Sequence, residues 1–327
     1  MRFGFRTVAC LCLCIMMSSL SACRKSEPVS RTGFALDTVI EIQIYEAKAN
    51  VDKESVLNDC FYEIARLEGL FSATLEESDV ARINDAHGET VVVSTETAKL
   101  LTESLRYAEL SDGAFDVTLR SVTELWDFSS KHVPNKQSIA TALKSVGYRR
   151  LAVNGTSVTA DDVKIDLGGI AKGYIADRLR DLLTARGVTS AMIDLGGNIV
   201  ACGNKAGEDW RIGVKDPNDT ELLCAVITGQ DVSVVTSGIY ERGFDLDGIR
   251  YHHLLSPETG MPVQNGLASV TIACRDSVQA DALSTACFVL GEEKGKRLVE
   301  SLDGVEALFV RQDGTLVATD GLSYTTA

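Results

Sequence analysis

The sequence lacks an excess of positive charge. Its 327 residues include 32 Lys and Arg against 46 Asp and Glu, which gives a formal net charge of −14. A chain this acidic has no general electrostatic attraction for nucleic acid or for anionic lipid. We therefore expect no nucleic-acid partner. A phosphate-bearing ligand would need local neutralisation by a metal ion, backbone amides or a well-placed lysine.

The nine cysteines include no CxxC pair. Three lie in an N-terminal apolar run, and Cys23 follows that run. The remaining five are odd in number and stand mostly in apolar surroundings: Cys60, Cys202, Cys224, Cys274 and Cys287. This pattern favours buried thiols over a disulfide framework or a zinc site, with a single disulfide as the alternative.

Histidine is scarce, with four residues in the whole chain. Two of them, His252 and His253, are adjacent in YHHLLSPETG (251–260), where a predicted strand runs into a Pro/Gly turn. Neighbouring residues of a strand face opposite sides, so at most one of the pair points into a given cleft. A histidine in that position can act as a general base or hydrogen-bond a phosphate.

Only one apolar run has the character of a membrane-directed segment. TVACLCLCIMMSSL (7–20) follows Arg2 and Arg6, and it is too short for a comfortable permanent span. Leu20-Ser-Ala-Cys23 at its end matches the lipobox of bacterial lipoproteins, in which the cysteine thiol is acylated before cleavage. The alternative is an ordinary small-residue cleavage site with an accidental cysteine.

These features predict the domain organisation. We expect a signal peptide over residues 1–22, lipidation at Cys23, a tether over 23–33 and a single folded body over 34–327. The body would lie on the periplasmic side of a bacterial membrane, with the inner membrane favoured, and would be held there by lipid.

Beyond the tether, strand-like and helix-like patterns alternate without a linker. FALDTVIEIQIY (34–45) is predicted as one strand, KIDLGG (164–169) as the end of another, and 170–187 as a helix. A further helix is expected over 276–291, with Asp276 as the candidate cap. Many spacings are typical of hairpins, so the mixture predicts an α+β fold with antiparallel sheets and packed helices.

The pentapeptide IDLGG occurs twice, at 165–169 and 193–197. In the first copy a strand, a Gly turn and a helix start would bring free N–H groups to one point, where Lys172 adds a charge. This predicts a phosphate site, and the alternative is a close-packed turn beside a solvated lysine. In the second copy the strand NIVACG is expected to continue, so its glycines would serve close backbone packing or approach to a flat ligand.

Near the C-terminus, Asp281 and Thr285 are i,i+4 neighbours on the expected helix and share a face. A carboxylate and a hydroxyl one turn apart can hold Mg²⁺ when a backbone carbonyl, water and substrate phosphates complete the oxygen ligands. The alternative is an Asp that only stabilises the helix dipole.

Seven segments, taken in order, resemble the ApbE-type FAD:protein FMN transferases and cover nearly all of the chain beyond the tether. They are GAFD (113–116), DLGGIAKGY (166–174), IDLGGN (193–198), WRIGV followed by DP, TSGIYER (236–242), YHHLLSPETG (251–260) and ADALSTACFVLG (280–291). The resemblance implies a T-fold-like α+β architecture that holds FAD in a cleft, with Mg²⁺ at the pyrophosphate.

The resemblance also implies roles for individual residues. Asp281, Thr285 and the backbone carbonyl of Gly169 would be the metal ligands. His253 would be the catalytic base, and His252 would be structural. FAD contacts would come from Leu36, Ala114, Phe115, Asp116, Asp166 and Lys172.

The implied reaction transfers FMN from FAD to a Thr hydroxyl of an exported target protein, with a motif resembling Asp-Gly-x-Thr-Ser/Gly-Ala/Ser-Thr, and releases AMP. Two residues depart from the family pattern: Ser256 replaces a usual Asp, and Thr74 stands where many members have Tyr. A more open site would admit water. The alternatives are therefore a Mg²⁺-dependent FAD pyrophosphatase and a non-enzymatic flavin-binding lipoprotein.

Overall fold

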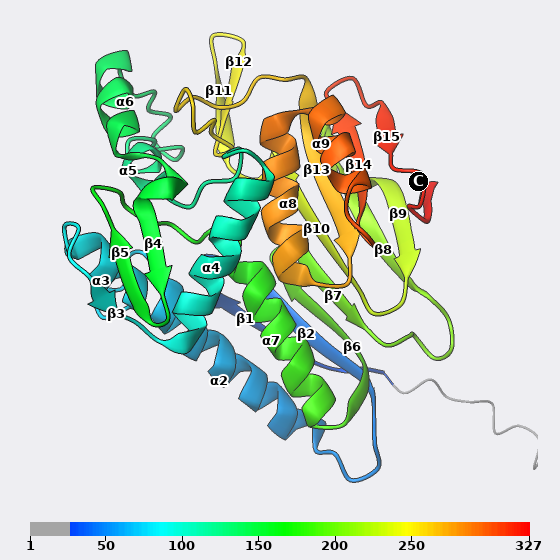
Figure 1. Cartoon of the computed structure of the whole chain (residues 1–327). Helices are drawn as coiled ribbons and strands as arrows, with labels where there is room; N and C mark the ends of the chain where they lie inside the picture. Colours follow the sequence, from blue (N-terminus) through cyan, green and yellow to red (C-terminus); the bar gives the residue numbers. More distant parts are fainter. Residues whose placement is uncertain (1–26) are drawn as a thin grey trace, which may run out of the picture.

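The computed structural model describes residues 27–327; the predicted signal peptide and Cys23 lie outside this range. The centre of the fold is an eight-stranded sheet in which every neighbouring pair is antiparallel (Figure 1). Its strands, in spatial order, are β1 (Val29–Ala35), β2 (Thr38–Ala47), β6 (Val188–Leu195), β7 (Asn198–Cys202), β10 (Val232–Gly238), β13 (Leu267–Cys274), β14 (Glu306–Arg311) and β15 (Leu316–Ala318).

Helices cover one face of this sheet (Figure 1). They are α2 (Lys53–Phe71), α7 (Ala171–Ala185), α8 (Ser277–Leu290) and α9 (Glu292–Glu300), with α4 (Thr95–Leu110) packed beside α8. In the part of the chain that is described, no helix is both long and apolar enough to cross a bilayer.

A second, three-stranded sheet packs on part of the opposite face. It consists of β8 (Trp210–Asp216), β9 (Asp219–Gly229) and β16 (Tyr324–Thr326), and its apolar side encloses the fully buried Trp210. Strand β13 is therefore covered on both sides, which explains why all eight of its residues are buried.

The remaining elements surround one end of the molecule. They are α3 (Asp79–Asp85), β3 (Val91–Val92), α5 (Arg120–Thr123), α6 (Lys136–Ala142), 3₁₀ turns at Leu143–Ser145 and Tyr148–Arg150, β4 (Leu151–Asn154), β5 (Ser157–Ala160), and the projecting hairpin β11 (Gly243–Leu246) and β12 (Ile249–His252) (Figure 1). The expected α+β class with antiparallel sheets is confirmed. The five cysteines of the described region are free, and four of them are buried.

The strand predicted over 34–45 is wrong as a single element. The chain reverses at Leu36 and Asp37, and β1 pairs with β2 from Val29 to Ala35, so the boundary predicted at residue 34 falls inside a strand. Both turn residues have positive φ, 54° and 58°. Two-residue hairpin turns normally use pairs such as Asn-Gly or Asp-Gly, and Leu36 at the first position hides the signal that Asp37 would otherwise give.

The strand predicted to end at Asp166, before the first Gly turn, is also absent. Only an isolated bridge joins Lys164 to Leu119. Instead, the side chain of Asn84 accepts a hydrogen bond from Ile165 N at 2.6 Å and donates to Ile165 O at 2.9 Å. The Asn84 amide thus takes the place of a neighbouring strand, because it hydrogen-bonds both the N–H and the C=O of Ile165 just before the first IDLGG turn.

The second IDLGG ends β6, and NIVACG is a strand as predicted, but it forms a separate strand instead of continuing β6. The chain turns at Gly196 and Gly197, both with positive φ, and returns as β7 antiparallel to β6. A Cβ atom at Gly196 would lie 2.2 Å from Oγ1 of Thr38, so the expected close packing is found there.

Candidate active site

A cavity of about 710 Å³ opens where several turns of the two sheets meet the start of α7. Its wall includes Leu36, Asp166, Lys172 and His253, four of the residues predicted for the site. The β1–β2 turn, the end of α2, the β6–β7 turn and the β8–β9 hairpin supply much of the remaining wall. Both IDLGG turns therefore reach the same cavity, through Gly168 and through Gly196 and Gly197.

The first turn holds Asp166 between two partners. Its Oδ1 accepts a hydrogen bond from Gly168 N at 2.8 Å, and its Oδ2 lies 3.3 Å from Nη1 of Arg120. One backbone donor of the turn is therefore used internally. The positive charge of Arg120 comes to the cavity wall instead, with the side chain only 16% exposed.

Helices α7 and α8 touch at Gly173. A Cβ atom on Gly173 would lie 2.3 Å from the carbonyl oxygen of Ser277, which is closer than atoms can approach. The same backbone donates Gly173 N–H to Oδ2 of Asp281 at 2.8 Å. The third glycine of DLGGIAKGY thus lets the lysine-bearing turn and the Asp281 carboxylate come together.

The N-terminus of α8 is capped from α7. Asp177 accepts hydrogen bonds from Ser277 N and Val278 N, each at 2.9 Å, whereas Asp276 makes no side-chain cap bond. Burial raises the pKa of Asp177 to about 6, against the effect of these two N–H groups and Arg180. Asp276 therefore occupies the N-cap position as predicted, but its side chain does not cap the helix, because a carboxylate from the neighbouring helix already accepts from the free N–H groups.

The three predicted metal-binding residues lie close together. A Cβ atom on Gly169 would be 3.7 Å from Oγ1 of Thr285, and Thr285 follows Asp281 by one turn of α8. The second oxygen of Asp281 accepts no hydrogen bond from residues 27–327. One carboxylate, one hydroxyl and one backbone segment fit Mg²⁺, which needs few protein ligands when phosphates supply others. In the same region no group of three or more His, Cys, Asp or Glu could form a metal site alone.

The charge of Lys172 acts on several neighbours. Burial raises the pKa of Asp281 above its usual range, while Lys172 and the Gly173 N–H oppose the rise. Glu241 lies on the cavity wall with part of its surface exposed to solvent. Desolvation by the surrounding protein raises the pKa of Glu241 to about 7, and the charge of Lys172 opposes this rise. Lys172 therefore lies close enough to stabilise the ionised forms of two carboxyl groups, Asp281 and Glu241, whose pKa values are raised. A bound cation or an anionic ligand would change the protonation of both groups.

The two adjacent histidines differ as expected for neighbours in an extended segment. His253 is half-buried on the cavity wall, and its Nδ1 lies 3.4 Å from the carbonyl of Arg242. Burial lowers the pKa of His253 to about 4, so its imidazole is neutral at pH 7. His252 is 1% exposed, pairs through Nε2 with Val263 O at 3.0 Å, and packs edge-on against Phe288.

The GAFD residues lie behind the wall rather than on it. Asp116 accepts from Thr118 N at 2.8 Å and from Tyr148 N at 2.9 Å, so its carboxylate organises the chain around the 3₁₀ turn. Phe115 is buried, with its ring 3.3 Å from a Cβ placed on Gly169. Ala114 does not line the cavity either. The structure thus separates these three residues from the four predicted ones on the wall.

Sequence reasoning missed several charged residues of the wall. These are Asp37, Glu68, Arg120, Asp194, Lys215, Glu241 and Arg242. Asp194 lies in IDLGGN, and Glu241 and Arg242 lie in TSGIYER, so the segments that carry the family resemblance were the available signal for them. Lys215 likewise stands between WRIGV and DP. Asp37, Glu68 and Arg120 come from elements far apart in the chain, and no motif spacing links them.

Of the two residues that depart from the family pattern, Thr74 lines the cavity and Ser256 does not. Thr74 is exposed on the cavity wall, where its hydroxyl lies 3.1 Å from Ser72 Oγ. Ser256 does not line the cavity; its Oγ accepts from Glu258 N at 3.2 Å and Thr259 N at 3.3 Å. A serine hydroxyl therefore holds the turn that an Asp would hold, and the change of residue leaves that turn intact.

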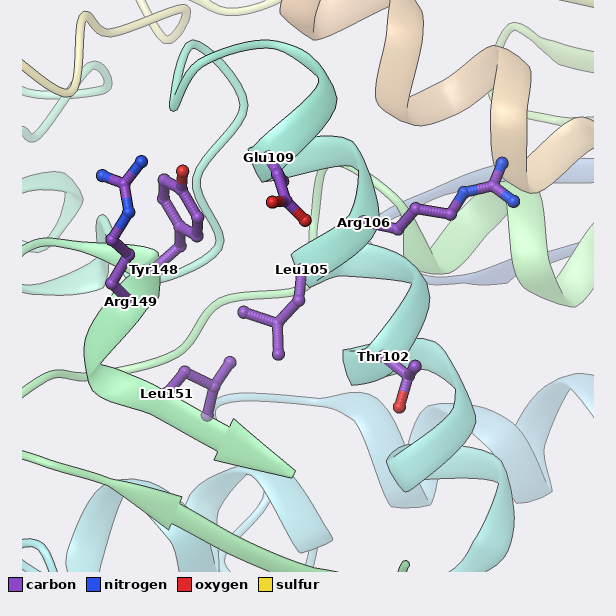
Figure 2. Close-up of a pocket in the computed structure, with 7 residues that line it drawn as sticks. All are labelled: Thr102, Leu105, Arg106, Glu109, Tyr148, Arg149 and Leu151. Carbon is purple, nitrogen blue, oxygen red and sulfur yellow. The ribbon is translucent and has the colours of Figure 1, made fainter. Parts of the chain in front are cut away.

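A separate hollow of about 430 Å³ lies between α4 and the segment from Tyr148 to Leu151 (Figure 2). Figure 2 shows Leu105 and Leu151 facing one another, with Arg149 beside Tyr148, over whose ring its guanidinium lies 4.7 Å from the centroid. None of the predicted site residues lines this hollow. The chemistry-bearing side chains gather at the larger cavity.

Comparison with known families gives a match over most of the chain. Residues 36–309 match the profile of the ApbE family. The chain is 35% identical to an FAD:protein FMN transferase of Treponema pallidum, over 95% of this chain and 92% of that one. It is also 35% identical to an FAD:protein FMN transferase of Klebsiella pneumoniae, over 81% and 84% of the two chains.

Solved structures agree with these matches. The ApbE protein of Thermotoga maritima superposes with a TM-score of 0.83 at 36% identity, covering 90% of this chain and 97% of that one. The flavinyl transferase ApbE of Pseudomonas stutzeri superposes with a TM-score of 0.79 at 30% identity, covering 92% and 95%. The similarity therefore extends over both sheets and the helices that frame the cavity.

Proposed function

The chain belongs to the ApbE family, and we propose that it is a Mg²⁺-dependent FAD:protein FMN transferase that attaches FMN to a threonine of its target. FAD is the substrate, and a flavin-accepting protein is the partner. The observation that carries the proposal is that Lys172 and His253 line one cavity, while the charge of Lys172 also acts on Asp281, which is buried behind the wall one helical turn before Thr285.

The reaction moves one phosphoryl group. The Thr oxygen of the acceptor forms a bond to the FMN-side phosphorus of FAD, the bond from that phosphorus to the bridging oxygen breaks, and AMP leaves. The products are a phosphoester-linked flavin, AMP and one proton. Such transfers depend on positioning and on neutralising the phosphate charge.

Lys172 and His253 would carry the two tasks that the chain itself performs. The Lys172 ammonium would pair with the pyrophosphate, and the Arg120 guanidinium brings a second positive charge to the same wall. His253, neutral at pH 7 because burial lowers its pKa to about 4, would accept the Thr proton as the new bond forms. Asp281, Thr285 and Gly169 would hold Mg²⁺, which supplies further positive charge at the phosphates.

The pyrophosphatase alternative is favoured by one observation, the exposed Thr74 on the cavity wall. A small side chain there leaves water more access than an aromatic one would. In that case water would replace the acceptor hydroxyl, and the products would be FMN and AMP.

One experiment separates these functions. The purified protein is incubated with FAD, Mg²⁺ and a target domain that carries the threonine motif, and AMP and the target mass are measured. We expect AMP release together with one added FMN mass. Equal AMP release without the target, and no mass gain, would establish the pyrophosphatase; absence of AMP in every condition would leave flavin binding alone.

We also propose that Cys23 carries the lipid anchor and that the protein acts on the periplasmic side, retained at the inner membrane. The support is the LSAC sequence directly after the apolar run. Labelled fatty acid should enter the protein in cells, and Cys23→Ser should abolish that label and release the protein from membranes. Retention of the label in Cys23→Ser would contradict the anchor.

A further inference from the structure

Exposed apolar side chains flank several of the chain segments that line the cavity. Ten large hydrophobic residues of the described region are exposed: Phe34, Val39, Tyr62, Leu75, Val92, Leu110, Leu222, Leu223, Leu246 and Ile249. Five of these ten lie within three residues of a cavity-lining residue, and they come from three separate segments. Single exposed apolar residues are ordinary, whereas a gathering around one opening indicates a contact surface.

The first segment is the β1–β2 hairpin. Phe34 and Val39 are directly opposed across the two strands, and they are 75% and 60% exposed. The next residues toward the turn, Leu36 to Thr38, line the cavity. Phe34 and Val39 therefore form a small exposed apolar surface next to the cavity-lining turn, on the face of the hairpin that points away from α2.

The second segment is the start of β9. Leu222 is 58% exposed and Leu223 is 46% exposed, two and three residues beyond the cavity-lining Thr220. A Cβ atom on Gly213 would lie 2.8 Å from the Leu223 side chain, so Leu223 lies over Gly213, which also lines the cavity. The third segment adds Leu75, 49% exposed, next to Thr74 on the wall.

We propose that these five residues, Phe34, Val39, Leu75, Leu222 and Leu223, form the apolar rim that docks the flavin-accepting protein. The proposal rests on the proposed function, which requires a hydroxyl of another protein to enter this cavity. The rim is continuous with the wall of that cavity at three places. The occupant is the part of the acceptor protein that surrounds its threonine motif, with apolar side chains outside the motif on both sides.

The charge of the molecule supports an apolar contact. At −14, the chain offers little attraction to an acidic acceptor, and apolar contact tolerates either sign of partner charge. Apolar side chains that become buried in the core of an interface contribute to its affinity because they leave water. The rim residues would therefore set the affinity for the acceptor while leaving the FAD contacts unchanged.

The test uses two rim variants and a matched control. The rim variants are Phe34→Ser with Val39→Ser, and Leu222→Ser with Leu223→Ser. The control is Tyr62→Ser with Val92→Ser, because Tyr62 is 75% exposed and Val92 is 63% exposed, and neither lines the cavity. FMN transfer is measured against the concentration of a folded target domain carrying the threonine motif, and FAD binding is measured separately by flavin fluorescence.

We expect each rim variant to raise the KM for the target domain by about tenfold or more, with FAD affinity within about twofold of the parent. The control variant should match the parent in both measurements. An unchanged KM in both rim variants, or an equal rise in the control, would overturn the docking rim while leaving the transferase function standing. FAD binding without any flavin transfer by the parent would overturn the proposed function, and the docking rim with it.

Discussion

At the scale of single residues, Asp281 uses its two carboxylate oxygens differently. Oδ2 accepts the Gly173 N–H and joins α7 to α8, while Oδ1 is available to a cation. The structural role and the proposed metal-binding role can therefore be separated by a substitution that keeps an oxygen acceptor but loses the charge.

We predict that Asp281→Asn folds normally and loses metal-dependent turnover by on the order of 100-fold. The amide oxygen can still accept from Gly173 N, and the cost of burying a charge disappears. AMP release at increasing Mg²⁺ concentration, together with thermal unfolding, measures the two roles. Parental activity in the variant would refute the metal assignment, and failure to fold would show that the hydrogen bond needs the charge.

At the scale of elements, the contact between α7 and α8 depends on one missing side chain. Gly173 faces the Ser277 carbonyl with no room for a Cβ, whereas Gly69 of α2 has no atom within 4 Å of the Cβ position. The two helical glycines thus occupy opposite steric environments, and the same substitution should have opposite effects.

We predict that Gly173→Ala destabilises the protein by about 2 kcal/mol or more, because the helices must separate. Gly69→Ala should instead stabilise it by about 0.5 to 1 kcal/mol, through the better helix propensity of Ala. Urea unfolding measures both. Since separation of the helices would move Lys172 from Asp281, Gly173→Ala should also lose turnover, and equal stability of the two variants would refute the close contact.

The β1–β2 turn depends on a hydrogen bond from outside it. Leu36 and Asp37 each cost free energy at positive φ, and Leu36 N donates to Oε1 of Glu68 at 2.9 Å. A charged acceptor strengthens that hydrogen bond and offsets part of the cost. Glu68, at the end of α2, therefore fixes a turn whose side chains line the cavity.

We predict that Glu68→Ala weakens FAD binding by about fivefold, since losing a hydrogen bond worth about 1 kcal/mol loosens the turn. Adding Asp37→Gly should restore much of the affinity, because glycine adopts positive φ without steric cost. Flavin fluorescence titration measures both. If Asp37→Gly gives no recovery, Glu68 acts on FAD by another route.

These elements also mark what the sequence could predict. Helix α7 was predictable because its apolar periodicity is local, and α8 because a run of residues without Gly or Pro ends at Gly291. The i,i+4 relation of Asp281 and Thr285 followed from the second helix. The β1–β2 turn was not predictable, since Leu36 is an unusual residue at positive φ and Asp37 alone is a weak turn signal. Nor was the backbone before Gly168, because its partner, Asn84, stands 81 residues away. Local patterns identified the candidates, and long-range contacts set their arrangement.

At the scale of the whole molecule, buried ionisable groups couple stability to pH. Burial lowers the pKa of His252 to about 4, whereas an unfolded histidine titrates near 6.5. Between pH 4 and 6.5 the imidazole of His252 is protonated in the unfolded chain but not in the folded one. The free energy of unfolding therefore decreases as the pH falls from 6.5 toward 4. Asp177, whose pKa is raised to about 6, acts in the opposite direction over part of this range.

We therefore predict that His252→Gln flattens the acid side of the stability profile. Glutamine can still donate to Val263 O but does not titrate. Comparison of parent and variant cancels the contribution of Asp177. The stability advantage of the parent should be larger at pH 7.5 than at pH 4.5, by on the order of 2 kcal/mol. Urea unfolding at both values measures it, and a pH-independent difference would contradict the buried neutral state.

Strand β1 has a consequence for the space in which the protein works. It runs about 20 Å from Val29 to the turn at the cavity mouth. The chain from Cys23 to Val29 can add at most about 20 Å more, even fully extended. With a lipid on Cys23, the cavity could therefore lie at most about 40 Å from the bilayer surface. Target threonines would be sorted by their height above the membrane as well as by their sequence.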